Sequence, residues 1–146
     1  MILTNDYIRG LVEGEGCFSF CNVPLKTGQS EKSRLPTFVL TMNERDKNLI
    51  EAVRSHFSLK NKVYELGPYK KDGHNRDAIA RLMVRDVGAL KNIIVPFFYN
   101  KLYGHKGTQF NEWIEAIGSD INVPESYKII WKLHKSGYYS KDSRFD

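Results

Sequence analysis

The sequence predicts an α+β domain in which one mostly antiparallel sheet is covered by helices on a single face. Three observations indicate this fold class. After an opening helix, a unit of two strands and a helix occurs twice, which gives the order α-β-β-α-β-β-α. Apolar and polar residues alternate along the strands, and each helix has one apolar stripe. The 146 residues are enough for one core, so we expect a single domain over 1–146. Its core is expected at about 4–118 and a helical extension at about 119–146.

Capping residues, turn residues and the spacing of apolar side chains give the element boundaries. Thr4, Asn43 and Asp86 are suitable N-caps for three helices, and Pro96 is expected to stop the third. The polar stretch 68–77 is expected to be a loop with turn residues. In chain order, the predicted elements are helix 4–14, strands 17–25 and 34–42, helix 44–57, strands 61–67 and 78–85, a helix from 87, and helices at 107–117 and from 124. Glycines at 118 and 137 are expected to stop the last two helices.

Alternation along the strands divides the predicted sheet into a core face and an open face. We assign the aromatic and aliphatic set of each strand to the core. For the strand at 61–67 the assignment stays open, because placing Lys62 and Tyr64 outward turns Glu65 inward. The polar set assigned to the open face is Ser19, Cys21, Thr37, Thr41, Arg81 and Arg85.

Basic residues are concentrated in one segment of the chain. Between Lys26 and Arg85 there are 13 Lys or Arg against 7 Asp or Glu, whereas the other residues have 9 against 10. The net charge of +5 indicates an anionic partner. A basic open face fits nucleic acid, and a plain solvated surface is the alternative interpretation of the same composition.

The sequence gives no sign of a membrane segment, a disulfide or a structural zinc site. No stretch approaches the roughly 20 apolar residues of a membrane-spanning helix, and the start is unlike a signal peptide. We therefore expect a soluble, intracellular protein with no membrane partner. Cys17 and Cys21 are four apart in a predicted strand, beyond disulfide reach. The cysteines and histidines lack the paired spacing of zinc ligands, and we interpret them as core and surface residues.

One segment carries a more specific pattern. Residues 8–16 read Ile-Arg-Gly-Leu-Val-Glu-Gly-Glu-Gly and lead directly into the strand predicted at 17–25. This segment resembles the signature of the LAGLIDADG homing endonucleases: its glycines, aliphatic pair and two acids occupy matching positions, and Arg9 replaces a small residue. Other segments that match the family pattern are 43–57, 81–86 and 96–106. The resemblance covers about residues 7–117, and the chain beyond it is looser.

The resemblance implies the homing endonuclease core, with an antiparallel sheet shaped as a saddle and an extra C-terminal helix. It also implies a homodimer, because the family's active site needs two motifs and this chain has one. Two such sheets would bind a long, nearly palindromic site on double-stranded DNA. The expected reaction is a staggered, metal-dependent double-strand cut that serves intron or intein homing. The residues expected at the dimer interface are Tyr7, Ile8, Gly10, Leu11 and Gly14, where the two glycines permit close helix approach.

The resemblance also assigns a metal site to the end of the motif. Glu15 would be a catalytic acid and metal ligand, and Gly14 would supply its backbone carbonyl to the same Mg²⁺ or Mn²⁺. Such an ion can activate a water nucleophile and stabilise the leaving oxygen. We interpret Glu13, the first acid of the motif, as structural.

A lysine completes the expected site. Lys106 matches the family's pocket lysine, which would offset negative charge near the scissile phosphate, and Lys101 is the alternative. Met42 takes a pocket position that is polar in some relatives, and its thioether cannot orient a water well. The residues expected to contact DNA are Ser19, Cys21, Lys26, Arg34, Thr37, Val39, Thr41, Lys62, Tyr64, Lys70, Lys71, Arg76, Arg81, Met83 and Arg85.

Two other functions are compatible with parts of this pattern. The same fold serves RNA-splicing maturases, which would add RNA as a partner, and DNA-binding proteins that do not cut. A His-Asn-His metal nuclease centred on His74 and Asn75 is weakly supported, because no second histidine has a suitable spacing. An organelle, mitochondrion or chloroplast, or the archaeal cytoplasm is the location that suits the resemblance.

Overall fold

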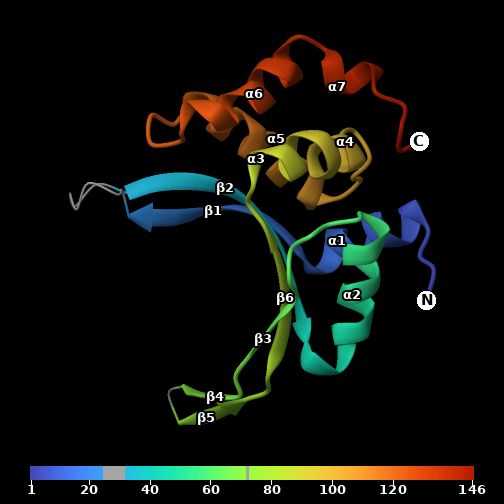
Figure 1. Cartoon of the computed structure of the whole chain (residues 1–146), viewed down its shortest axis with the longest axis vertical. Helices are drawn as coiled ribbons and strands as arrows, with labels where there is room; N and C mark the ends of the chain where they lie inside the picture. The colour runs from blue at the N-terminus through green and yellow to red at the C-terminus, as the bar shows by residue number, and fades with distance from the viewer. Residues whose placement is uncertain (25–31, 72) are drawn as a thin grey trace.

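The computed structural model describes residues 1–24, 32–71 and 73–146 (Figure 1). The helices are α1 (Asn5–Glu15), α2 (Lys47–His56), α3 (Val87–Ala89), α4 (Val95–Phe98), α5 (His105–Ser119), α6 (Lys128–Lys135) and α7 (Tyr138–Lys141). The strands are β1 (Gly16–Pro24), β2 (Lys32–Asn43), β3 (Tyr64–Leu66), β4 (Tyr69–Lys71), β5 (His74–Arg76) and β6 (Ile79–Val84). Short 3₁₀ turns at Glu44–Asp46 and Glu125–Tyr127 precede α2 and α6, and a π-helical turn at Leu90–Ile94 joins α3 to α4.

Four strands form an antiparallel sheet in the order β1-β2-β6-β3. Figure 1 shows a curved sheet with α1 and α2 on its convex side. In the described part of the chain, no helix covers the concave side. The predicted fold class is therefore confirmed, and one face of the sheet is left open.

The core lies between this sheet and the helices. Phe18, Phe38, Leu40 and Leu82, which alternate with polar residues along the strands, are at most 4% exposed, as the alternation predicts. Phe18 meets Phe110 of α5 edge to face, with 4.9 Å between ring centroids. Burying each aromatic side chain contributes about 1.5–3 kcal/mol, so α5 is held firmly against β1.

The stretch 68–77, predicted as a loop, is instead a two-stranded ribbon of β4 and β5. The ladder pairs Lys71 with His74, so two residues connect the strands. One of them, Gly73, has a φ of 75°, which a glycine accepts without strain in a two-residue hairpin turn. Gly73 was thus the sign of a hairpin. The strand predicted at 61–67 is correspondingly shorter and begins only at Tyr64.

Pro96 does not stop its helix, contrary to the prediction. The helical path runs from Val87 to Phe98, because a wider turn precedes the proline. In that turn Val95 donates its N–H to the carbonyl of Leu90, five residues back. Pro96 then falls in the first turn of α4, where a missing N–H costs little.

The wider turn leaves two carbonyls open to outside donors, and the end of the chain supplies them. Tyr139 Oη donates to the carbonyl of Lys91 over 3.0 Å, and Arg144 Nη2 donates to the carbonyl of Asn92 over 3.1 Å. Satisfying these groups fastens α7 and the residues after it to the helix at 87–98. The helix α7 itself was not predicted.

Gly118 was expected to stop α5, yet α5 continues to Ser119. A Cβ at Gly118 would lie 2.3 Å from Cγ of Trp131, so the glycine serves the close approach of α6 rather than the helix end. Gly137, with a φ of 83°, does follow the end of α6 as predicted.

Cys17 and Cys21 are free thiols, in agreement with the spacing argument. Among the described residues, none of the helices has the length and apolar character needed to cross a membrane.

Candidate active site and nucleic-acid interface

The motif segment forms α1 and passes directly into β1. Thr4 caps the helix, with its Oγ1 accepting from the N–H of Tyr7 over 3.1 Å. At the other end, a Cβ at Gly16 would lie 2.6 Å from Cγ1 of Val12, so a side chain there is excluded and the chain turns at once into the strand. This turn leaves Glu15 exposed at the junction of α1 and β1, where the motif places it.

Lys106 reaches the same junction from α5. Its Nζ donates to the carbonyl of Gly16 over 2.5 Å. Gly16 directly follows Glu15, so the lysine binds the backbone one residue after the acid. Lys101, the alternative, points elsewhere and pairs with Asp146 over 3.1 Å. This geometry favours Lys106 as the lysine of the candidate active site.

Glu13 holds the start of α5 against α1. Its carboxylate accepts from the backbone N–H groups of Tyr103 and Gly104, over 3.0 and 2.8 Å. Because Gly104 immediately precedes α5, these two bonds set where Lys106 stands. The arrangement agrees with the structural interpretation of Glu13.

The oxygen atoms at this junction suit a hard divalent cation, but one chain supplies few of them. Glu15 makes no hydrogen bond or ion pair with the described residues, and its neighbour Gly14 offers a backbone carbonyl. Within the described ranges, no three His, Cys, Asp or Glu side chains gather into a metal-binding group. A carboxylate with a neighbouring backbone carbonyl is a pair of oxygen ligands of the kind that Mg²⁺ takes.

Strand register places the predicted open-face residues in rows across the sheet. Thr41 of β2, Arg81 of β6 and Tyr64 of β3 form one row, in which Arg81 Nε donates to Thr41 Oγ1 over 3.1 Å. Val39 and Met83 form the next row. The register also resolves β3: Tyr64 faces outward with Arg81.

Glu65 of β3 turns to the helix side of the sheet, as the outward position of Tyr64 requires. There its Oε1 pairs with Nζ of Lys47 in α2 over 3.1 Å. An inward acid is tolerated because it lies at the sheet edge, half exposed, beside a lysine.

A groove on the open face lies beside β3 and β6. It encloses about 400 Å³ and is lined on its basic side by Lys62, Arg81 and Arg85, and by Tyr64 and Met83. The facing of Arg81, Met83 and Arg85 agrees with the prediction, whereas that of Lys62 and Tyr64 had been left open. That they contact DNA stays a prediction.

Arg34 does not belong to this face. It shares its side of β2 with Phe38 and Leu40, its guanidinium lies over the ring of Phe20 at 4.4 Å, and it pairs with Asp120 at the end of α5. The alternation rule applied to β2 would have assigned Arg34 to the helix side, where an acid receives it.

Thr37 lies on the open side of β2 but is only 1% exposed, so it cannot reach DNA in this structure. Its Oγ1 donates to the carbonyl of Leu35 over 2.9 Å. Arg85, which follows β6, sends its Nη1 across β2 to Sγ of Cys21 in β1, at 3.5 Å, and so passes over this part of the strand. Alternation gives the side of a strand that a residue faces, but not what covers it.

Five other predicted DNA contacts are placed less fully. Lys70, Lys71 and Arg76 belong to the ribbon of β4 and β5, which extends beyond the four-stranded sheet (Figure 1). Lys26 lies outside the described residues. Ser19 lies half-buried opposite Thr37 in the β1–β2 ladder.

One face of α1 is exposed. Tyr7, Gly10, Leu11 and Gly14 recur at the spacing of a single helix face, and a Cβ at either glycine would meet no described atom within 4 Å. Ile8 is the exception among the predicted interface residues: it is fully buried in the core, on the opposite face with Val12.

Arg9 is the residue that the sequence argument undervalued. It is 7% exposed, and its Nε and Nη2 donate to the carbonyls of Phe97 and Phe145 over 3.1 and 2.6 Å. A signal was available, because position 9 is adjacent to Ile8 on the apolar side of the helix. A charged residue there requires buried acceptors.

A family model described as LAGLIDADG endonuclease matches residues 8–117. Because this match covers well over half of the sequence, the chain belongs to the LAGLIDADG endonuclease family. No curated protein matches significantly.

Solved structures of homing endonucleases share the fold. I-TnaI is 23% identical with a TM-score of 0.64, over 95% of this chain and 79% of that one. I-LtrWI bound to target DNA is 26% identical with a TM-score of 0.63, over 91% and 43%. I-CpaMI bound to uncleaved DNA is 20% identical with a TM-score of 0.64, over 92% and 45%. The chain thus spans less than half the length of the two DNA-bound relatives.

Proposed function

We propose that two copies of this chain form a homing endonuclease that binds a long, nearly palindromic duplex DNA site and makes a staggered, divalent-metal-dependent double-strand cut. The observation that carries the proposal is the junction of α1 and β1, where the exposed Glu15 stands beside the Gly16 carbonyl that Lys106 contacts. Membership of an endonuclease family and a basic open face support double-stranded DNA as the partner. Homing requires access to the host genome, so the proposal includes action inside the cell, in an organelle or an archaeal cytoplasm.

The dimer is supported by what one chain lacks. A single motif helix presents one free carboxylate, and its exposed face has two glycines with open space around them. Two such helices packed across a two-fold axis would bring both Glu15 residues together at the centre of two joined sheets. The lengths of the DNA-bound relatives, of which this chain spans less than half, are consistent with two units per active endonuclease.

The residues have separable roles in the proposed cut. Glu15 and the Gly14 carbonyl would hold Mg²⁺ or Mn²⁺, which when bound supplies an activated water and neutralises developing charge. Lys106 holds a positive charge near the phosphate, fixed by the Gly16 carbonyl and indirectly by Glu13. Met42 pairs with Ala80 and packs against the core, and its thioether is a poor group for orienting a water.

Glu15→Gln tests this assignment. The change keeps the shape of the side chain and removes the charge that holds the cation, so DNA affinity and dimer content should stay near those of the wild type. Cutting should fall by about two orders of magnitude or more, because the interaction that is removed acts chiefly in the transition state. The measurements are a gel-shift titration and single-turnover cleavage in Mg²⁺, on a duplex containing the insertion junction of the protein's own gene.

Glu112→Gln is the matched control, since Glu112 is an exposed acid of α5. It should bind and cut normally. Near-normal cutting by Glu15→Gln would overturn the assigned chemistry. Loss of binding together with cutting would instead make Glu15 a structural residue.

A further inference from the structure

The buried face of α1 carries one charged side chain, Arg9. Its guanidinium donates hydrogen bonds to acceptors that are distant in the sequence. Two of its nitrogens donate to the backbone carbonyls of Phe97 and Phe145, 88 and 136 residues away. The guanidinium also lies 4.5 Å from the centroid of the Phe97 ring. Its third partner, Asp6, is 96% exposed and 3.5 Å away, which makes it a weak one.

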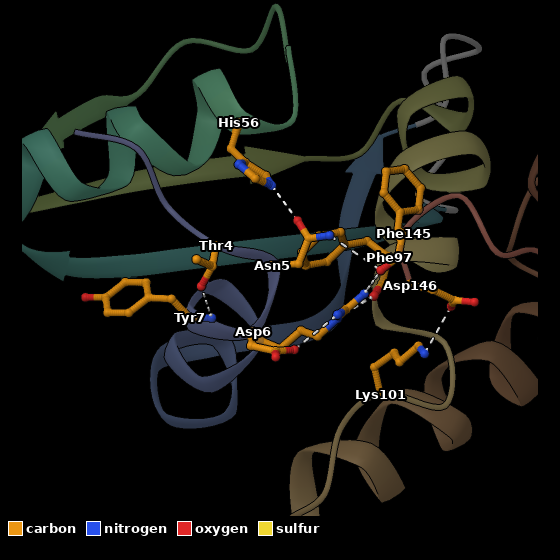
Figure 2. A network of polar contacts seen from close by, with 10 residues as sticks. Thr4, Asn5, Asp6, Tyr7, His56, Phe97, Lys101, Phe145 and Asp146 are labelled. Carbon is orange, nitrogen blue, oxygen red and sulfur yellow. Dashed lines mark hydrogen bonds and ion pairs between the residues drawn. The ribbon is translucent and has the colours of Figure 1, made fainter.

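The Phe145 carbonyl is the shortest of these contacts, at 2.6 Å, and Asn5 also donates to it over 3.5 Å. Figure 2 shows the residues of this network, with Asn5 and Phe145 facing one another between α1 and the end of the chain. A buried guanidinium without acceptors is strongly destabilising. The conformation of α1 at Arg9 therefore depends on the position of Phe145.

The same segment also touches the connection that leads to Lys106. Asp146 pairs with Lys101, which lies between α4 and α5, over 3.1 Å. The Phe145 ring packs on Phe97 with 5.6 Å between centroids, and Arg144 holds the carbonyl of Asn92. Residues 142–146, here named the strap, thus bridge the motif helix and the segment that carries the lysine.

We infer that the strap is a positioning device for the active site, acting through Arg9 on Glu15 and through Lys101 on Lys106. The catalytic part of this inference rests on the proposed function. The strap contacts α1 on the face opposite Tyr7, Gly10, Leu11 and Gly14, so it supports the helix from behind while that face stays free. The family match ends at residue 117, and the strap lies wholly beyond it.

Three variants test the coupling: Arg9→Ala, a chain ending at Arg144, and the combination of both. Each single variant should speed amide hydrogen exchange of residues 5–16 at least tenfold. It should also slow single-turnover cleavage by about 10- to 100-fold at saturating protein, while the Kd for DNA stays unchanged, because the reacting groups are displaced slightly rather than removed. The combined variant should lose less than the sum of the two single losses, since both variants remove the bond between Arg9 and the Phe145 carbonyl.

Tyr139→Phe is the stability control. It removes the bond to the Lys91 carbonyl and loosens α7 without touching α1 or the strap. At a temperature well below each Tm it should cut at the wild-type rate, even where its Tm falls as far as that of Arg9→Ala.

Unchanged exchange of residues 5–16 in both single variants overturns the inference, as do additive losses in the combined variant. If Tyr139→Phe loses as much cutting as Arg9→Ala at the same Tm, the strap stabilises the fold in general and does not position the active site. A wild-type protein that cuts no DNA would refute the proposed function. Amide hydrogen exchange, and whether the Tm losses of the two single variants add up in the combined variant, would still decide whether Arg9 and the strap are coupled.

Discussion

At the scale of single residues, glycine has two opposite uses in this chain. Gly16 and Gly118 are required inside the folded unit, because a Cβ would lie 2.6 Å from Val12 or 2.3 Å from Trp131. Gly10 and Gly14 have open space around them, although each costs close to 1 kcal/mol in a helix relative to alanine. The single chain does not need the second pair, which points to a requirement outside it.

Arg81 is the residue whose replacement should report most directly on DNA binding. It lies on the open face, with its Nε bonded to Thr41, and lines the groove there. Arg81→Ala should weaken binding. If the guanidinium binds phosphate, the slope of log affinity against log salt should fall by about one for each phosphate that is no longer neutralised. If it binds a base, sequence preference should relax at one position of each half-site.

A salt titration by fluorescence anisotropy distinguishes these results. Arg45→Ala, an exposed arginine on the turn between β2 and α2, should leave the titration unchanged. Binding by Arg81→Ala that matches the wild type at every salt concentration would show that the open face of β6 is not the DNA surface.

Among the elements, α6 is joined to α5 in part through one exposed carboxylate. Glu115 accepts from Lys135 over 2.7 Å, from Trp131 over 3.1 Å and pairs with His134 over 3.2 Å. His134 in turn meets Tyr99 Oη over 2.6 Å. The contact with Lys135 first, then those with Trp131 and His134, lower the pKa of Glu115 to about 2.

This pKa gives a pH dependence of known sign. The folded value lies below the ordinary 4.5, so the stabilisation from Glu115 is complete above about pH 4.5 and is lost as the pH falls toward 2. Glu115→Gln should therefore have a lower Tm than the wild type at pH 7. The difference should shrink between pH 4.5 and 2. Calorimetric scans across that range check it, and parallel Tm curves for the two proteins would contradict it.

Some elements could be predicted from the sequence and others could not. The sheet, its faces and most helix starts follow from local rules, since Thr4 and Asp86 do cap helices. The continuation through Pro96 and the helix α7 were missed, because each depends on the other through bonds to distant carbonyls. A helix boundary predicted from neighbouring residues cannot include such partners.

The candidate site shows the same division. Glu15, Lys106 and the exposed face of α1 were placed by the motif and its spacing. Ile8 and Thr37 were misassigned because spacing does not give burial. The acceptors of Arg9 are backbone carbonyls far along the chain, which no sequence pattern marks.

For the whole molecule, the proposed function depends on the proposed self-association. Gly10→Leu should leave the single chain folded, because leucine favours a helix by about 0.8 kcal/mol over glycine and its Cβ has room. The larger side chain should force the two motif helices apart. Dimer content and cutting should then fall together, measured by sedimentation velocity and cleavage of the same samples.

Asn48→Leu on the exposed side of α2 is the control for added apolar surface and should change neither measurement. Unaltered assembly of Gly10→Leu would remove α1 from the interface. Full activity of the wild type at the mass of one chain would remove the dimer altogether.

The bond between Asn5 and Phe145, 3.5 Å long, has a consequence for topology. It brings both ends of the described chain to the same side of the molecule, as Figure 1 shows. A flexible linker could join Asp146 to Met1, and the chain could be reopened before Gly137, where α6 has ended. In such a circular permutant the strap would be synthesised before the helix that it supports. The order of the segments along the chain would then change, while the contacts within the folded unit would stay the same.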